Sequence, residues 1–173
     1  MTVTLLEYPT EKDWIEVKRR ALVTVGKNPV NPPDLEWKKK ILDARHSPIR
    51  YLKFCFYLED VPYYVSTHLV RHVHSQPYVR SQRNDRQEEY DRNSARQDAP
   101  VNMIYDMNGE QMLIFANKRL CGAADPTTRH LATMMCRAVK EVCPEFEDFL
   151  IPMCEYQGGY CHEMFSCGRC SKI

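Results

Sequence analysis

The stretch IRYLKFCFYLED, residues 49–60, places Leu52, Phe54, Phe56 and Leu58 two residues apart. This spacing puts the four side chains on one face of a β-strand, so the stretch predicts a strand with one buried face. On both sides of it, apolar residues recur at intervals of three and four, which is typical of helices. Helical segments around such a strand predict an α+β fold, with a small mixed sheet packed against helices.

Helix start signals divide the rest of the chain. Polar residues that cap helices precede several apolar patterns, and prolines and glycines mark where those patterns begin or end. The expected helices cover residues 10–26, 34–45, 62–72, 110–121 and 125–143, so the third is expected to carry Arg71 and His72 near its C-terminal end. Residues 75–100 are polar and poorly periodic, and we expect an ordered functional loop there with one short strand.

Length and net charge limit the classes of protein to which this chain can belong. A chain of 173 residues is long enough for one domain with a proper core. We expect that domain to cover 1–150 and a cysteine-rich tail to cover 151–173. The net charge of +1 makes nucleic acid an unlikely partner. No segment approaches the roughly 20 apolar residues of a membrane span, and the N-terminus lacks a secretion signal. We therefore expect a cytoplasmic protein.

The segment RHVHSQPYVRSQRNDR, residues 71–86, contains four arginines and no lysine. The planar guanidinium group can form two parallel hydrogen bonds to a phosphate or a carboxylate, which the point charge of lysine cannot do. The segment therefore indicates oriented contacts with an anion. The alternative is a solvated surface arm whose charge is balanced by neighbouring acidic residues.

The order of short motifs points to a family. The tripeptide RHV at 71–73 is followed, after seven residues, by SQR at 81–83. This spacing resembles the signature of the flavin-dependent thymidylate synthases, in which R-H-R precedes the serine and Val73 takes the place of the third arginine. HSP at 46–48 and NGEQMLIFANKRLC at 108–121 follow in register, so the resemblance runs from about Arg45 to Leu150. The chain resembles a divergent, compact member of that family.

The resemblance implies a reaction and its partners. It implies methylation of dUMP to dTMP, with FAD as cofactor, methylenetetrahydrofolate as carbon donor, NADPH as reductant and a homotetrameric assembly. A related flavoenzyme making another 5-substituted pyrimidine nucleotide is the nearest alternative. Arg119 falls where the family has the arginine that activates the uracil ring, and Ser81 is expected to bind substrate and not to attack it. The implied flavin-binding residues are Ser47, Arg71, His72, Val73 and Asn108. The implied nucleotide-binding residues are His68, Arg71, Arg80, Ser81, Gln82, Arg83 and Arg119.

Eight cysteines suggest a separate feature. Four lie in the last 20 residues, with the spacing C-x6-C-x5-C-x2-C, and the closing CGRC resembles half of a zinc knuckle. The sequence predicts a structural zinc site on Cys154, Cys161, Cys167 and Cys170, with His162 as a substitute ligand. Disulfides and a disordered tail of free thiols are the alternatives, and a zinc-containing nucleic-acid-binding protein is the second hypothesis for function. The remaining cysteines, Cys55, Cys121, Cys136 and Cys143, are expected to be small buried thiols.

Overall fold

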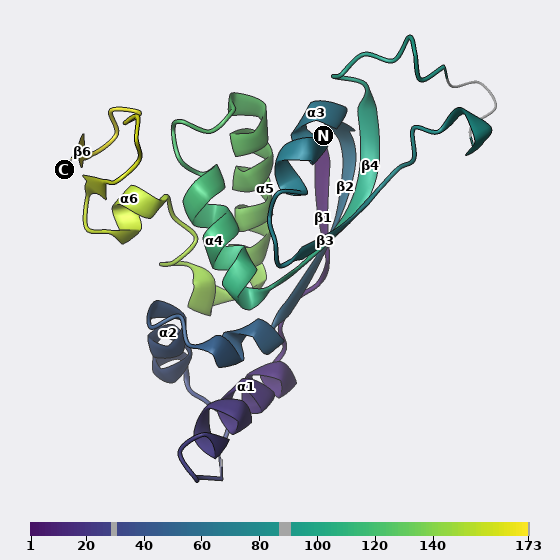
Figure 1. Cartoon of the computed structure of the whole chain (residues 1–173). Coiled ribbons are helices and arrows are strands. Elements are labelled where there is room, and N and C mark those ends of the chain that lie inside the picture. Colours follow the sequence, from purple (N-terminus) through teal and green to yellow (C-terminus); the bar gives the residue numbers. More distant parts are fainter. Residues whose placement is uncertain (29–30, 87–90, 173) are drawn as a thin grey trace.

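A four-stranded antiparallel sheet forms the centre of the molecule in the computed structural model, which describes residues 1–28, 31–86 and 91–172 (Figure 1). Its order is β1-β2-β4-β3, with β1 at Thr2–Glu7, β2 at Lys53–Pro62, β3 at Ser75–Val79 and β4 at Pro100–Asn108. The α+β class is confirmed. The sheet is antiparallel throughout and not mixed, because β4 inserts between β2 and β3, which run in the same direction.

One face of the sheet forms the core. The pairs Phe54–Met107, Phe56–Tyr105 and Leu58–Met103 lie side by side on β2 and β4, and all six side chains are buried. The strand predicted over residues 49–60 is thus confirmed as β2. No strand was predicted at β1 or β4, although β4 carries the same alternation.

Six α-helices accompany the sheet in the described part of the chain. They are α1 (Glu11–Val23), α2 (Leu35–Asp43), α3 (Tyr63–Leu69), α4 (Gly109–Arg119), α5 (Pro126–Val142) and the short α6 (Met153–Tyr156). The 3-10 turns η1 (Ser47–Tyr51), η2 (Asn84–Arg86) and η3 (Pro144–Phe146) and the two-residue strands β5 (Tyr160–Cys161) and β6 (Ser171–Lys172) complete the fold. The helix starts predicted at residues 10, 34 and 125 are capped: Thr10 and Asp13 form a capping box, and Asp34 and Asp125 accept backbone N–H bonds at 2.8 Å.

The third helix ends earlier than predicted. It stops at Leu69, whose carbonyl accepts a hydrogen bond from the buried Tyr105 hydroxyl at 2.9 Å and another from the His72 N–H at 3.1 Å. These bonds satisfy the last carbonyl of the helix and turn the chain toward β3. Arg71 and His72 therefore lie in the turn after α3.

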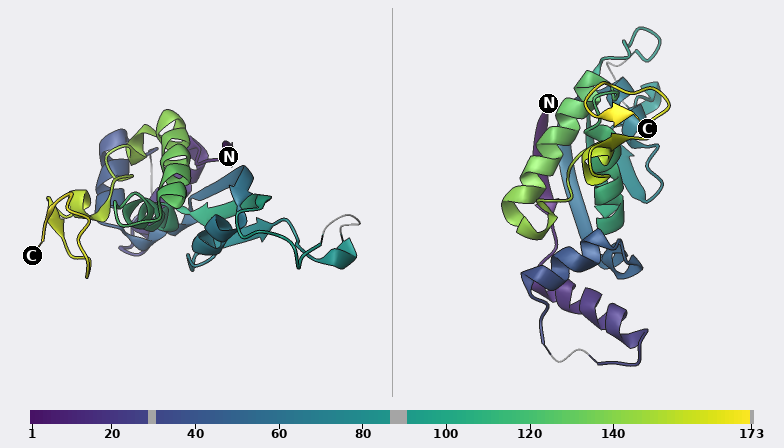
Figure 2. Two further views of the ribbon diagram at one scale, coloured as in Figure 1. Left: turned by 90° about the horizontal axis from the view of Figure 1, so that it is seen from above. Right: turned by 90° about the vertical axis from the view of Figure 1, so that its left-hand side faces the viewer.

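The helices and the two irregular segments occupy different parts of the molecule. Helices α4 and α5 lie against the sheet (Figures 1 and 2). The β3–β4 connection projects from one end as an arm, residues 80–99, of which 87–90 lie outside the described residues. The C-terminal tail, residues 151–172, lies at the opposite end. No helix among the described residues is long and apolar enough to cross a membrane.

Candidate functional site

One side of α4 contacts the turn that follows α3. Gln111, Phe115 and Arg119 are four residues apart, so they share a face of the helix. All three reach the imidazole of His72: the Gln111 amide is 3.0 Å from Nδ1, the Phe115 ring stacks edge-on at 5.3 Å, and Arg119 Nε donates to Nε2 at 2.9 Å. The family signature residue His72 and the predicted catalytic Arg119 are therefore in direct contact.

The His72 ring is held in its neutral form. Burial and, to a smaller extent, the nearby positive charge of Arg119 together lower the pKa of His72 to about 4. Because Arg119 Nε–H donates to Nε2, this ring nitrogen is an acceptor, and the amide nitrogen of Gln111 lies beside Nδ1. Protonation of Nε2 would bring its N–H into contact with the N–H of Arg119 Nε, and the hydrogen bond would be lost. The ring thus works as a fixed acceptor that orients the arginine.

We expect this arrangement to make stability pH-dependent. The pKa of His72 is about 4 in the folded chain and near 6.5 when unfolded, so the unfolded state binds the extra proton first as pH falls. The contribution of His72 to the free energy of unfolding is complete above pH 6.5 and decreases as the pH falls toward 4. Urea unfolding across this range should show a smaller acid loss for His72→Gln than for wild type. The exposed His130→Gln is the matched control, and an acid loss unchanged in His72→Gln would contradict the assignment.

Two guanidinium groups gather at this site. Arg119 is half-buried, and its Nη2 donates to the carbonyl of His68 at 2.6 Å. Burial lowers the pKa of Arg119; the Tyr105 hydroxyl opposes that shift, and the charge of Arg71 adds to it. Arg71 is exposed, and neither it nor Arg119 is paired with a carboxylate within the described ranges. Two neighbouring cations without an acid favour an anionic ligand.

His68, predicted to bind nucleotide, contributes its backbone to the site. Its Nδ1 lies 2.8 Å from the hydroxyl of Thr128, which in turn donates to Asp125 at 2.9 Å. The side chain therefore points to the start of α5, and the carbonyl of His68 faces Arg119.

The other predicted flavin residues lie at the opposite end of α4. The turn η1 presses on the first residue of the helix: the Gly109 N–H donates to the Leu52 carbonyl at 2.9 Å, and a Cβ at Gly109 would lie 2.6 Å from the Ile49 oxygen. Ser47 begins η1 and is exposed, whereas the Asn108 side chain caps α4 by accepting from the Gln111 N–H at 2.8 Å. Val73 is 84% exposed and carries no polar group.

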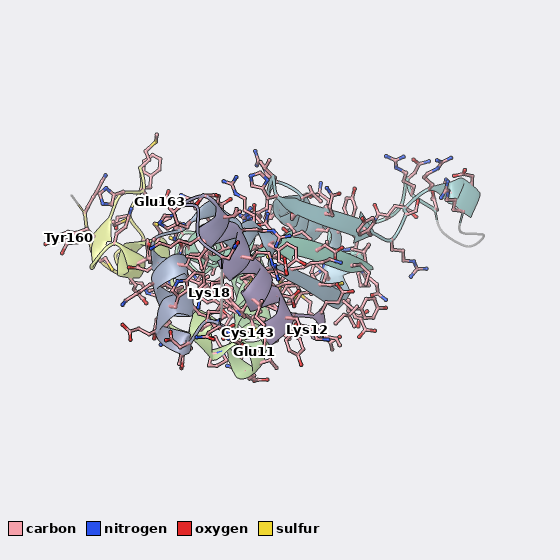
Figure 3. All side chains as sticks on the ribbon, turned by 90° about the horizontal axis from the view of Figure 1, so that it is seen from below. Glu11, Lys12, Lys18, Cys143, Tyr160 and Glu163 are labelled. Carbon is pink, nitrogen blue, oxygen red and sulfur yellow. The ribbon has the colours of Figure 1, made fainter. Side chains whose placement is uncertain are left out.

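The arm carries the remaining nucleotide-binding candidates. Arg80 begins it, with its N–H bonded to the carbonyl of Asn102 at 2.9 Å, and Gln82 is half-buried. The Arg83 N–H donates to Ser81 Oγ at 3.3 Å, and its guanidinium pairs with both oxygens of Asp85, at 2.9 and 2.6 Å. Side chains with nitrogen tips extend from the arm at one end of the molecule, while Tyr160 and Glu163 mark the tail at the other (Figure 3).

The cysteines are arranged differently from the zinc site predicted on the tail. In the described part of the chain, no three His, Cys, Asp or Glu side chains already stand where they could hold a metal ion. The tail cysteines line one cavity together with Cys121, which was expected to be an ordinary buried thiol and is half-exposed. The prediction that Cys55, Cys136 and Cys143 are buried is confirmed.

Comparison with solved structures identifies the architecture. The chain matches the crystal structure of thymidylate synthase X (ThyX) from Helicobacter pylori with FAD and dUMP, with a TM-score of 0.70 and 14% identity over 87% of this chain and 99% of that one. The chain has the ThyX fold. A second structure of flavin-dependent thymidylate synthase ThyX from Helicobacter pylori, complexed with FAD and dUMP, gives a TM-score of 0.69 and 15% identity, over 86% and 99%. No protein-family model matches the sequence, and no curated protein matches it significantly.

Gln111 and Tyr105 belong to the site but were not predicted from the sequence. Gln111 lies three residues after the cap Asn108 and eight before Arg119, so the helical period alone could have placed it on the same face. Tyr105 gives no such signal, because its role depends on meeting the end of α3 across the fold.

Proposed function

We propose that this chain is a flavin-dependent thymidylate synthase-like methyltransferase, which converts dUMP to dTMP with methylenetetrahydrofolate as carbon donor and NADPH as reductant. The pair of guanidinium groups at Arg71 and Arg119 carries the proposal, because the neutral His72 orients Arg119 and neither arginine is paired with a carboxylate in the described ranges. The ThyX fold supports it, since the compared ThyX structures hold FAD and dUMP.

The residues present suit a dinucleotide cofactor of negative charge. Arg71 is an exposed cation beside the site, and Ser47 and Asn108 supply polar groups where η1 meets α4. When bound, FAD would carry the one-carbon unit and supply the hydride. Ser47, Arg71, His72 and Asn108 would hold it. Val73 offers no charge where the family signature has an arginine, so we expect weak flavin binding.

The fixed guanidinium of Arg119 supports its proposed role in activating a uracil ring. Uracil C5 is a poor nucleophile, and negative charge develops on the ring as C5 attacks. A guanidinium fixed by His72 Nε2 and the His68 carbonyl needs no reorganisation to stabilise that charge. The His72 ring, kept neutral, leaves the charge of Arg119 for the substrate. Arg119 is therefore our catalytic residue, and His72 is its positioning residue.

The arm would contribute to the site of another copy of the chain and not to its own. Its tip, around η2, projects away from α4 in two views at right angles (Figures 1 and 2). We propose that Ser81 and Arg83 grip the 5′-phosphate of dUMP in the site of another copy, in a homotetramer. The sheet face opposite the core supplies a surface for association: Tyr57, Ile104 and Tyr78 form one cross-strand row there, half-buried or exposed.

Reconstitution with FAD tests the function. The protein should acquire a flavin absorption band, sediment as a tetramer, and convert dUMP to dTMP when methylenetetrahydrofolate and NADPH are added. A product of different mass would indicate another 5-substituted nucleotide. A monomer that takes up no flavin and binds single-stranded nucleic acid would contradict the proposal and favour the nucleic-acid-binding alternative.

Replacing Arg83 by alanine is expected to weaken dUMP binding. The change removes one charge-assisted contact to phosphate, a loss on the order of 1.5–3 kcal/mol. Arg96→Ala is the matched control, because Arg96 lies on the same arm and pairs with Asp98 as Arg83 pairs with Asp85. Isothermal titration with dUMP should separate the two variants, and equal losses would show that the arm acts only through its net charge.

A further inference from the structure

A cavity between α4 and the tail gathers cysteines from distant parts of the chain. It has a volume of about 180 Å³, and five thiols line it: Cys121, Cys154, Cys161, Cys167 and Cys170. Cys121 lies in the α4–α5 connection, more than 30 residues before the others. The cavity therefore joins the tail to the end of the helix that carries Arg119.

The thiols contact one another in two pairs. The Cys167 side chain is hydrogen-bonded to that of Cys121, and the Cys154 side chain is hydrogen-bonded to that of Cys170. Cys167 is also close enough to Cys154 for the two thiolate forms to repel each other, so the two pairs are neighbours. Cys167 packs closely against Gly122, since its Sγ lies only 2.8 Å from where a Cβ on that residue would be.

Backbone N–H groups point at two of these sulfur atoms in the same way. The N–H of Ala123 donates to Cys121 Sγ, and the N–H of Arg169 donates to Cys167 Sγ, each from two residues further along. A glycine stands between donor and cysteine in both, and Gly168 has a φ of +82°, which favours glycine. Cys167 accepts a further bond from the N–H of Gly122. Such donors stabilise the negative charge of thiolate ligands.

We propose that Cys121, Cys154, Cys167 and Cys170 together bind one Zn²⁺ as a four-thiolate site. Four sulfur ligands in tetrahedral geometry form the usual closed zinc site of proteins. Each thiol loses its proton to solvent on binding, so the S–H···S bonds of the two pairs are exchanged for Zn–S bonds. Since no three potential ligands in the described ranges stand ready to hold an ion, zinc must draw the two pairs together.

This ligand set differs from the one that the spacing of the tail predicts. Cys121 takes the place of Cys161, which lines the same cavity from β5 but is not part of either thiol pair. Zinc held in this way would fasten the tail two residues beyond Arg119, at the end of α4. The proposal does not depend on the proposed enzymatic function, since its tests read metal content and ligand type.

Metal analysis of the full chain, purified under reducing conditions, tests the proposal. We expect about one zinc per chain, and well below that in Cys121→Ser. The matched control Cys161→Ala removes a thiol from the same cavity and should keep its zinc. Gly122→Ala leaves every thiol in place, yet its Cβ would meet Cys167 Sγ, so it should also lose zinc.

Cobalt substitution shows the ligands directly. The visible spectrum of the Co²⁺ protein should have the intensity of a tetrahedral four-thiolate site, and Cys121→Ser should weaken it even where the variant stays folded. Zinc retained in Cys121→Ser and lost in Cys161→Ala would overturn this ligand set. Metal-free protein with a Cys121–Cys167 disulfide found by mass spectrometry, or an iron–sulfur spectrum, would overturn zinc itself.

Discussion

Replacing Arg119 by alanine is expected to lower kcat for dTMP formation by about 100- to 1000-fold, with a much smaller change in the Kd for dUMP. His72 Nε2 and the His68 carbonyl fix the guanidinium before reaction. In the proposed mechanism its contact with the uracil ring would strengthen only as charge develops. An interaction of that kind lowers the barrier without contributing equally to ground-state binding. Steady-state kinetics and equilibrium dUMP titration of the FAD-reconstituted protein together measure the two effects.

Two further variants make this result interpretable. Lys118→Ala removes the adjacent exposed cation, which pairs with Glu163 on the tail, and should leave kcat near wild type. His72→Gln keeps a neutral hydrogen-bonding side chain next to Arg119, so it should lower kcat less than Arg119→Ala and change the pH profile. If Arg119→Ala raises the dUMP Kd and leaves kcat intact, Arg119 only binds substrate and the uracil-activating role is wrong.

The sequence predicted the fold best where local patterns and packing agree. The alternation in residues 49–60 predicted a strand, and the start signals at Thr10, Asp34 and Asp125 predicted helices; the structure confirms both. It failed where tertiary contacts decide. Helix α3 ends at Leu69 because Tyr105, from a strand 36 residues away, takes its last carbonyl. The antiparallel sheet likewise depends on β4 entering between β2 and β3.

The site also has features that could be predicted from local sequence and features that depend on tertiary contacts. The motif spacing led to both His72 and Arg119, and the structure places them in contact although 47 residues separate them. The electrostatic state of His72 could not be predicted, because it depends on burial against Phe115 and on the direction of Arg119. The cysteine spacing suggested a metal-binding tail, but Cys121 joins the cavity only through the fold.

Replacing Phe146 by alanine is expected to lower the free energy of unfolding by about 3–5 kcal/mol. Phe146 is fully buried in η3, where its ring meets Phe54 edge-on at 5.2 Å and Trp14 at 6.3 Å. The cluster joins α1, η3 and β2, and the neighbouring Glu145 accepts the Trp14 indole N–H at 2.6 Å. A cavity here would remove ring contacts from three elements, and would loosen the position of that buried hydrogen bond.

Phe165 provides the matched control for this change, since the same substitution there removes a ring that is 80% exposed on the tail. Phe165→Ala should change the free energy of unfolding by no more than about 0.5 kcal/mol. Urea denaturation followed by tryptophan fluorescence reports directly on this region, because Trp14 is in the cluster and Trp37 lies on the nearby α2. Similar losses in the two variants would mean that the tail is as much a part of the core as η3. A loss below about 1 kcal/mol in Phe146→Ala would mean that the cluster collapses around the missing ring and that the α1–η3 corner is not tightly packed.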